Sequence, residues 1–510
     1  MVKVVTTIAL DGINGIPVFV EASHLGSSPE PKTDLIGLPD TAVKEALGRV
    51  RAAALSSSLA LYGGRNTVNL APADVKKEGS SFDLPILLSL LDNSRHGDLA
   101  FDNKCFAGEL SLTGELRPIN GALCMAISAA KHGISEIFLP SENAVEASAA
   151  KNISVFPVKN VIQLFRHLTG DELIQKSEFS FDAFYSDSLC AMLDFSDVKG
   201  QETAKKALEI SAAGMHNVLM IGPPGSGKSM LASRMPSILP PITLEESIET
   251  TKIHSVAGIL SKQMPLVSVR PFRAPHHSLS IAGLAGGGKT PKPGEISLSH
   301  NGILFLDEFP EFDKSATEVL RQPLEERKIN ITRVSGTVTY PCSFILVCAM
   351  NPCRCGYYGH PTKQCTCSPL ARKSYLSRIS GPLLDRIDIQ LEIPALEFNE
   401  LSERRLSESS AEIRKRVIAA RDFASKRFEN NSMANAYMQQ SDLRKYCVLD
   451  DSGTQLMKKA FDKLTLSARS YDRILRVART VADFDSSDDI KSHHLALALR
   501  LRCLDKKYFN

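Results

Sequence analysis

The residues with the clearest capacity for chemistry form a glycine-rich loop that ends in a lysine and a serine. The loop reads Gly222-Pro223-Pro224-Gly225-Ser226-Gly227-Lys228-Ser229. In this spacing, backbone N–H groups can surround a phosphate at a helix N-terminus, Lys228 can reach the outer phosphates, and Ser229 can hold Mg²⁺. The spacing therefore predicts a phosphate-binding loop for a nucleotide, with a purely structural glycine turn as the alternative.

Two adjacent acids follow an apolar run further along the chain, where Ile303-Leu304-Phe305-Leu306 precedes Asp307-Glu308. A buried strand that ends in two carboxylates suits a Mg²⁺ ligand, here Asp307, and a base that orients an attacking water, here Glu308. A strand that merely ends in surface acids is the alternative. Together with the loop, the pair predicts an ATP hydrolase that uses Mg²⁺.

The elements that must position these residues are short apolar strands and the helices between them. Val218 to Ile221 reads as a buried strand before the loop, and Met230-Leu231-Ala232 begins a helix after it. A third apolar strand, Phe344 to Met350, ends at Asn351. The sequence therefore predicts an α/β domain around the loop.

Length and composition limit the remaining organisation. The chain has 510 residues, 43% of them hydrophobic and 23% charged, which indicates a soluble globular protein of roughly three domains. Apolar runs long enough to span a bilayer and the layout of a signal peptide are both missing from the sequence, so we expect a cytoplasmic protein without membrane partners. The net charge of +3 says little about partners.

The segment from Thr250 to Gly294 contains no Asp or Glu and is rich in glycine and proline. A flexible segment whose charged side chains are all positive suits contacts to DNA phosphates, whereas a merely solvated loop usually carries charges of both signs. A hairpin over Arg327 to Tyr340 is a second candidate contact, with a plain surface hairpin as its alternative. The candidate nucleic-acid residues are Arg270, Arg273, Lys289, Lys292, Lys328 and Arg333.

Four of the eleven cysteines gather between residues 353 and 367 as two C-x-C pairs, a poor arrangement for a disulfide framework. Each pair can offer two thiolates to one tetrahedral ion, so the cluster predicts a structural Zn²⁺ site, with free thiols as the alternative. The candidate ligands are Cys353, Cys355, Cys365 and Cys367.

Patterns along the chain divide it into a mixed α/β domain over residues 1–170, a linker over 171–193, the loop-containing domain over 194–395 and a helical domain over 396–510. The first domain resembles the Lon-protease-like, S5-type domain at Lys77 to Asp83 and around Arg117 to Gly121. Ser81 lies near the position of the protease serine, but Leu123 occupies the position of the lysine base. Because leucine cannot accept a proton, we expect this domain to have lost proteolysis.

Several of the longer motifs in the chain are specific to one group of ATPases rather than to ATPases at large; the motifs are GPPGSGKS, RPFRAPHHS, ILFLDE, AMNPCRCGYYG, SGPLLDRID and SARSYDRILRVART. With them, nearly the whole chain resembles the ComM/YifB family of magnesium-chelatase-like AAA+ ATPases. The resemblance implies an AAA+ module of the helix-2-insert clade, a helical lid and a homo-hexameric ring. It also implies a DNA helicase that drives branch migration on single-stranded, branched or double-stranded DNA during natural transformation and recombination.

The same resemblance implies roles for further polar residues. Asn351 matches the sensor that contacts the γ-phosphate or the attacking water. Arg386, with Arg378 in reserve, matches the arginine finger that reaches the nucleotide of a neighbouring subunit, and an ordinary surface arginine is the alternative. On the lid, Arg469 is the first candidate for a contact to the γ-phosphate in the same chain, and Arg473 lies on the same helix face.

Three other functions use the same features. A magnesium-chelatase motor subunit would use the ATP site to remodel a partner protein and would not respond to DNA. A protein-unfolding chaperone would respond to unfolded polypeptide, and a Lon-like peptidase would depend on Ser81.

Overall fold

The computed structural model describes residues 3–24, 32–91, 93–96, 99–180, 192–260, 264–288, 291–333, 336–395, 407–428, 434–464, 466–502, 504 and 508. The chain forms two compact units. The first unit combines Met1–Phe184 with Leu244–Val267, and the second combines Tyr185–Thr243 with Ser268–Asn510. Much of the predicted linker (residues 181–191) and the first part of the predicted lid (396–406) lie outside the described residues.

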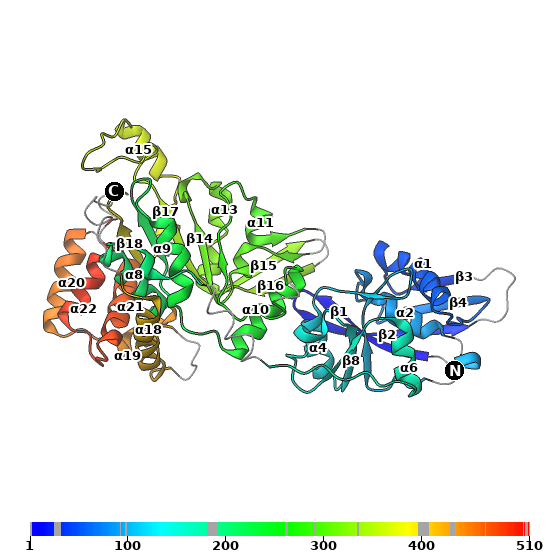
Figure 1. Cartoon of the computed structure of the whole chain (residues 1–510). Coiled ribbons are helices and arrows are strands. Elements are labelled where there is room, and N and C mark those ends of the chain that lie inside the picture. Colours follow the sequence, from blue (N-terminus) through cyan, green and yellow to red (C-terminus); the bar gives the residue numbers. More distant parts are fainter. Residues whose placement is uncertain are drawn as a thin grey trace. The chain divides into compact units, whose positions relative to one another are not determined.

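A seven-stranded mixed sheet forms the centre of the first unit, in the order β3-β4-β2-β1-β5-β8-β9 (Figure 1). Its antiparallel part joins β1, β2 and β4, while β1, β5, β8 and β9 run parallel to one another. The strands are β1 (Lys3–Asp11), β2 (Asn14–His24), β3 (Lys32–Ile36), β4 (Arg65–Ala71), β5 (Lys104–Phe106), β8 (Glu136–Pro140) and β9 (Ser154–Val158).

Helices cover both faces of this sheet because its strands alternate their apolar side chains between two cores. Val5 and Val18 point into a core shared with α1 (Thr41–Ser56), α2 (Asp83–Leu90) and α6 (Val161–Thr169). Ile8 points into the opposite core, shared with α4 (Ala122–Lys131). Asp40 caps α1 by accepting a 2.8 Å hydrogen bond from the N–H of Val43.

Helix α10 (Leu244–Ala257) departs from the predicted boundaries, because it packs in the first unit although the chain reaches it from the second. Its Ile248, together with the following Leu266, packs against the α4-side core. The thiol of Cys124 on α4 also donates to the carbonyl of Lys252 at 3.6 Å. The first eight residues of the acid-free segment, 250–257, thus belong to a packed helix rather than an open loop.

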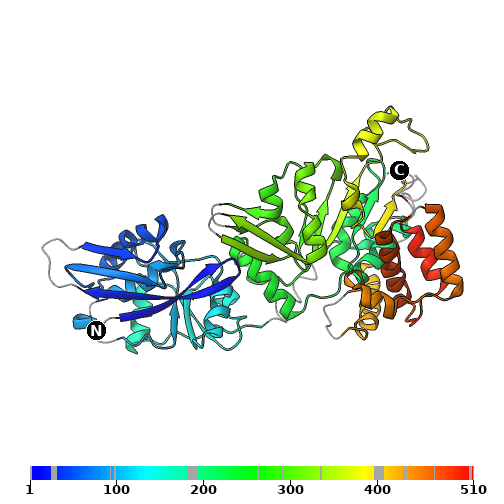
Figure 2. The same cartoon turned by 180° about the vertical axis from the view of Figure 1, so that it is seen from behind.

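A five-stranded sheet, parallel throughout, organises the second unit and is seen from its two sides in Figure 1 and Figure 2. The order is β11-β14-β17-β10-β18, so the strand before the glycine-rich loop lies between two neighbours. The strands are β10 (Val218–Ile221), β11 (Phe272–Arg273), β14 (Ile303–Leu306), β17 (Ile345–Met350) and β18 (Ile389–Glu392). Adjacent helices include α8 (Glu202–Gly214), α9 (Lys228–Arg234), α13 (Lys314–Glu318), α14 (Arg321–Glu326), α15 (Pro369–Leu376) and α16 (Gly381–Leu384).

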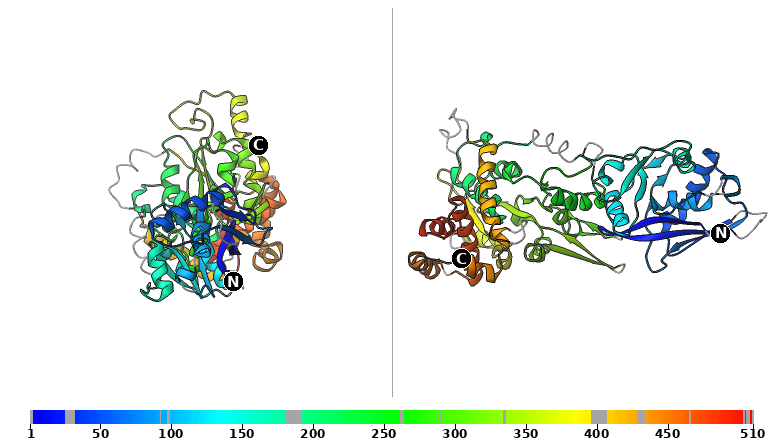
Figure 3. Two further views of the ribbon diagram at one scale, coloured as in Figure 1. Left: turned by 90° about the vertical axis from the view of Figure 1, so that its right-hand side faces the viewer. Right: turned by 90° about the horizontal axis from the view of Figure 1, so that it is seen from below.

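The C-terminal helices pack onto this sheet domain and share its core. Ile413, Leu475 and Val477 belong to the same apolar cluster as Val218 and Ile303. Figure 3 shows these helices, coloured from brown to red, gathered beside the sheet of their own unit. They are α18 (Ser410–Ser425), α19 (Gln440–Tyr446), α20 (Asp451–Leu464), α21 (Ala468–Phe484) and α22 (Ser492–Arg500).

Two small antiparallel ribbons of the second unit lie against each other, and we call them the basic hairpin pair. The first joins β12 (Gly286–Gly287) to β13 (Lys292–Pro293), and the second joins β15 (Lys328–Arg333) to β16 (Gly336–Pro341). A side chain at Gly286 would meet Ile331 at 2.5 Å, and the hydroxyl of Tyr340 donates to the carbonyl of Pro291 at 2.9 Å. The predicted hairpin over 327–340 is confirmed, apart from Val334 and Ser335, which lie outside the described residues.

The predicted fold class is confirmed: both units are α/β, and the chain ends in a helical domain. In the described part of the chain, no helix is both long and apolar enough to cross a membrane.

Candidate active site

The glycine-rich loop connects β10 to α9 and requires its glycines for geometric reasons. Gly225 and Gly227 have φ angles of 76° and 85°, in the left-handed region that favours glycine. At Gly222, a Cβ atom would lie 2.3 Å from the carbonyl oxygen of Ile393. The Cβ position of Gly225 meets nothing within 4 Å, so the loop is open where a phosphate would approach.

Lys228 lies at the start of α9 with its ammonium group inside the loop. Only 8% of the residue is exposed, and its Nζ donates to the carbonyl oxygens of Gly222 and Pro223 at 2.8 and 2.9 Å. Asn351, at the end of β17, contacts the same Nζ through Oδ1 at 3.3 Å. Burial lowers the pKa of Lys228, and the charge of Asp307 opposes that effect. A phosphate is a better partner for this cation than carbonyl oxygens are, so the loop fits a nucleotide.

The two candidate Mg²⁺ ligands lie side by side at the edge of the sheet. The hydroxyl of Ser229 donates to Oδ2 of Asp307 at 2.6 Å, and the N–H of Glu308 donates to Oδ1 of the same carboxylate at 2.9 Å. Hydroxyl and carboxylate oxygens are the ligands that Mg²⁺ prefers, and the ion usually keeps several waters besides. The donor set at Ser229 and Asp307 therefore fits Mg²⁺.

Glu308 has a partner that the sequence analysis did not anticipate. Nδ1 of His277 lies 3.0 Å from Oε2 of Glu308. His277 follows β11, which runs parallel to β14 and therefore ends at the same edge of the sheet. Its ring lies against His276 and Phe312, with centroids 4.0 and 6.4 Å away. The available signal was the histidine pair in RPFRAPHHS, a motif that indicated the family and the positive charge but to whose histidines no role was assigned.

A cavity of about 740 Å³ contains these residues, a size suited to a nucleotide. It brings together the predicted Lys228, Ser229, Asp307, Glu308 and Asn351 from three strand ends. The remaining lining residues are Pro224, Gly225, Ser226, Gly227, Met230, Ala274, Pro275, His276, His277 and Phe305.

The two predicted arginine-finger candidates differ in exposure. Arg386 is only 6% exposed and donates to the carbonyl of Pro382 and to the carboxylate of Glu325. A finger must project from its subunit, so the burial of Arg386 disfavours it for this role. The side chain of Arg378 is 48% exposed, and it pairs with Glu311 at 2.6 Å.

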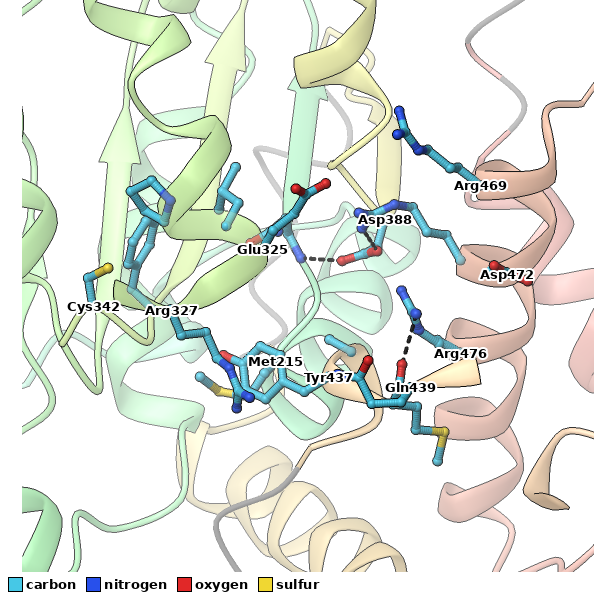
Figure 4. A pocket seen from close by; sticks show the side chains of 17 residues that line it. Met215, Glu325, Arg327, Cys342, Asp388, Tyr437, Gln439, Arg469, Asp472 and Arg476 are labelled. Atoms are coloured by element: carbon cyan, nitrogen blue, oxygen red, sulfur yellow. Dashed lines mark hydrogen bonds and ion pairs between the residues drawn. The ribbon is translucent and has the colours of Figure 1, made fainter. Parts of the chain in front are cut away.

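Arg469 and Arg473, predicted to reach the nucleotide of the same chain, line a different cavity of about 310 Å³. Figure 4 shows Arg469 and Arg476 on one helix of that cavity, opposite Glu325 and Arg327. Arg473 pairs with the buried Asp388, whereas Arg469 is largely exposed and lies 3.9 Å from Asp385. Neither Arg469 nor Arg473 lines the cavity of the glycine-rich loop, so the structure does not place them as sensors for it.

The predicted nucleic-acid residues also separate into two groups. Arg270 is 7% exposed and donates to the carbonyls of Pro240, Pro241 and Asn301, so its guanidinium is not available to DNA. Arg273 forms two hydrogen bonds with Glu295, at 2.6 and 2.7 Å. The exposed candidates are Lys292, Lys328 and Arg333, all on the basic hairpin pair, and Lys289 lies outside the described residues.

The four predicted zinc ligands converge after β17. Sγ of Cys353 lies 3.4 Å from that of Cys355 and 3.7 Å from that of Cys365, and all four sulfur atoms lie within 4.8 Å of one another. Zn–S bonds of about 2.3 Å in a tetrahedron require sulfur atoms roughly 3.8 Å apart. Burial alone would raise the pKa of Cys355, but donors led by the N–H groups of Tyr357 and Thr366 lower it to about 5. The cluster therefore fits a tetrahedral metal ion.

In the first unit, the position of the protease lysine is apolar. Leu123 is fully buried in the α4-side core and can serve as no base. Ser81, near the protease serine position, is also buried. This arrangement supports the expectation that the domain does not cleave peptides.

Comparisons with known proteins agree with this architecture. The family model described as "Magnesium chelatase, subunit ChlI" matches residues 194–401, "Subunit ChlI of Mg-chelatase" matches 21–143, and "Magnesium chelatase, subunit ChlI C-terminal" matches 407–502. YifB of Salmonella typhimurium, an uncharacterized protein, is 41% identical over 505 residues, which cover 99% of this chain and 97% of that protein.

Two further relatives carry names that indicate a function. Competence protein ComM of Haemophilus influenzae is 41% identical over 498 residues, 97% of this chain and 96% of that protein. The magnesium-chelatase 67 kDa subunit of Chlorobaculum parvum is 26% identical over 165 residues, 32% of this chain and 24% of that protein. The chain belongs to the ComM/YifB family of magnesium-chelatase-like AAA+ proteins.

Proposed function

We propose that this protein is an ATP-driven DNA motor, a hexameric helicase that drives branch migration when DNA is integrated during natural transformation and recombination. The observation that carries the proposal is the assembled cavity of Lys228, Ser229, Asp307, Glu308 and Asn351, in the unit that also carries the basic hairpin pair. The full-length similarity to a competence protein supports the DNA-related part.

Each residue of the cavity has a role in ATP hydrolysis that follows from its position. Lys228 neutralises the outer phosphates, and Asn351, within 3.3 Å of its Nζ, contacts the γ-phosphate or the attacking water. Glu308 orients that water and accepts its proton. Ser229 and Asp307 hold Mg²⁺, which neutralises phosphate charge when bound.

The cavity lacks one component that phosphoryl transfer generally uses. None of its lining residues in the described chain is an arginine, yet phosphoryl transfer of this kind commonly uses an arginine, besides the lysine and Mg²⁺, to stabilise the charge that develops on the transferred group. We therefore propose that Arg378 of a neighbouring subunit completes the site in a ring, because its guanidinium is half-exposed.

DNA would contact the basic hairpin pair. Lys292, Lys328 and Arg333 are exposed, and the two ribbons that carry them pack together, so their charges form one surface. Contacts of lysine and arginine to phosphates release counterions and make binding depend on salt.

The cysteine cluster would hold a structural Zn²⁺, since four thiolates leave no open position for catalysis. Purified protein should contain one zinc per chain by elemental analysis, and Cys365→Ser with Cys367→Ser should remove it. Cys447→Ala changes a buried cysteine outside the cluster and should keep the zinc. The site would be contradicted if wild-type protein contained no zinc and its stability were the same with and without added zinc.

ATPase rates with different effectors test the main proposal. We expect forked DNA to stimulate hydrolysis at low salt, and the stimulation to fall as salt rises. Lys292→Glu with Arg333→Glu should abolish stimulation without changing the basal rate, whereas Lys151→Glu on the first unit is the control. Stimulation by unfolded polypeptide alone would indicate a chaperone, and an ATPase indifferent to both would favour the chelatase-type motor suggested by the family models.

A further inference from the structure

The second cavity described above, between α21 and the start of β15, contains positive charge that the site for ATP does not use. Figure 4 shows Arg476 of α21 on one side of this cavity and Arg327 on the other. Arg327 lies between the end of α14 and the start of β15. The volume of about 310 Å³ is in the range of sites for small molecules.

The guanidinium of Arg476 is only partly satisfied by the protein. Its Nη2 donates to the carbonyl of Met438 at 2.8 Å, whereas its Nε is buried and has no hydrogen-bond partner. Burial lowers the pKa of Arg476, because surroundings of low polarity disfavour the charged form. A buried donor that lacks a partner is costly, and more so on a charged group. Arg476 can therefore bind a further acceptor.

Arg327 has unused donors on the opposite side of the cavity. Its guanidinium carbon lies 4.5 Å from the centre of the Tyr437 ring. The Tyr437 hydroxyl lies 3.1 Å from Oγ of Ser343, so the ring is held in place. A guanidinium stacked on a ring uses its face for that contact, and its N–H groups remain available in its plane.

The acidic side chains of the cavity do not neutralise these two arginines, because each acid already has another partner. Neither Arg327 nor Arg476 forms an ion pair with a carboxylate of the described residues. The acids are Asp388, Glu325 and Asp472, and their respective partners are Arg473, Arg386 and Gln440. The cavity therefore has a local excess of positive charge.

An anion with oxygen atoms on several sides fits this arrangement. The guanidinium fork matches the oxygens of phosphate and carboxylate groups. A phosphoryl group can accept from two opposite arginines at once, whereas a carboxylate presents its two oxygens in one direction. The volume also leaves room for a second phosphoryl group or for an ester group.

We propose that this cavity binds a small molecule with a phosphoryl group, held between Arg327 and Arg476. The site is separate from the cavity of the glycine-rich loop and shares no lining residue with it. Because Arg327 precedes β15 and Arg476 lies on α21, the bound molecule would join the C-terminal helices to the basic hairpin pair.

The test is calorimetric titration of pyrophosphate, without Mg²⁺, into protein that carries Lys228→Ala. This background weakens the competing contribution of the glycine-rich loop. Arg327→Met and Arg476→Met each remove one guanidinium and keep much of the side-chain length. Arg444→Met, at an exposed position of α19 in the same unit, is the control. Inorganic phosphate and AMP are titrated in parallel, to distinguish free phosphates from a nucleotide as the source of the phosphoryl group.

We expect one pyrophosphate to bind per chain and each of the two variants to raise its Kd roughly 10- to 100-fold, the effect of losing hydrogen bonds to a charged group. Arg444→Met should leave the Kd unchanged. Bound pyrophosphate should also raise the Tm of the second unit and slow amide exchange in β15, and both effects should vanish in Arg327→Met.

The inference would be overturned if none of the three probes bound, or if Arg327→Met and Arg476→Met bound them as the parent does. Displacement of pyrophosphate by an oligonucleotide would also overturn it, because the cavity would then belong to a path for DNA. If Arg476→Met fails to fold, Arg327→Met decides, since its side chain is partly exposed. None of these measurements involves ATP hydrolysis, so a negative result leaves the proposed function untouched.

Discussion

Replacing Arg270 by methionine tests whether this residue is structural, as its burial indicates, or a DNA contact, as the charge of its segment suggested. Its guanidinium donates to three carbonyls, with Nε to Pro240 at 2.7 Å, Nη1 to Asn301 at 2.9 Å and Nη2 to Pro241 at 3.0 Å. The bonds to Pro240 and Pro241 join the segment that leaves the second unit before α10 to the segment that returns after it. Methionine keeps much of the volume and removes all three donors.

The expected loss follows from the orphaned carbonyls. A buried acceptor that loses its partner costs about 1–3 kcal/mol. The carbonyl of Asn301 is buried, whereas water can reach those of Pro240 and Pro241 in part, so we expect a total loss of about 3 kcal/mol. For a unit of about 300 residues, that corresponds to a fall in Tm of roughly 5 °C. Differential scanning calorimetry should show the fall in the transition of the second unit, while Lys292→Met, at an exposed position, should change Tm by less than about 2 °C.

DNA binding supplies the contrasting readout. The logarithm of the DNA-binding constant falls linearly with the logarithm of the salt concentration. Each phosphate of duplex DNA that a basic side chain neutralises makes this slope steeper by about 0.9. Measured below the transition temperature, Arg270→Met should keep the wild-type slope, and Lys292→Met should reduce it. An unchanged Tm together with a reduced slope for Arg270→Met would refute our structural assignment of this residue.

Three further predictions concern other buried charges. Burial raises the pKa of Glu146 to about 7, so the folded first unit should lose stability as pH rises from 4.5 to 7. Glu146→Gln should then stabilise this unit at pH 8 by up to about 3 kcal/mol and should change its stability little at pH 4, which urea unfolding can measure. Burial would raise the pKa of Asp388, but Arg473 and then His216 outweigh this effect and lower the pKa. The ionised carboxylate therefore stabilises the folded unit fully above pH 3.8, and this stabilisation is lost only in stronger acid. Asp388→Asn should therefore destabilise the second unit at pH 7 by about 3–5 kcal/mol, because Arg473 loses its charge partner, and an unaffected Tm would contradict this. Lys228→Ala should weaken binding of a fluorescent ATP analogue roughly 10- to 100-fold, with Lys151→Ala as the control, and equal affinity would exclude the loop as the nucleotide site.

The local parts of the site were predictable from the sequence because each is a short motif with its own geometry. The glycine-rich loop between a strand and a helix, and the acids at the end of β14, lie where the spacing indicated. The spacing of the cysteines likewise anticipated that their sulfur atoms converge. In all three cases, residues close in sequence decide the arrangement.

Relations between distant segments were not predictable from one sequence. Whether Arg386 is exposed depends on Glu325, far away in the chain, and nothing near Arg386 indicates that pairing. The contact of His277 with Glu308 requires knowing that β11 pairs beside β14, and β11 is only two residues long. The packing of α10 on the first unit depends on a surface that α4 provides, so charge alone suggested an open loop.

The most direct test of the account is separation of a forked DNA duplex by wild-type protein and by Glu308→Gln at two salt concentrations. We expect wild-type protein to separate the strands with ATP at low salt and less at high salt. Glu308→Gln should bind the same DNA without separating it, because the variant lacks the base that activates water. Binding of DNA without ATP-dependent strand separation by the wild type, or strand separation that persists in Glu308→Gln, would contradict the claim that ATP hydrolysis at this cavity drives a DNA motor.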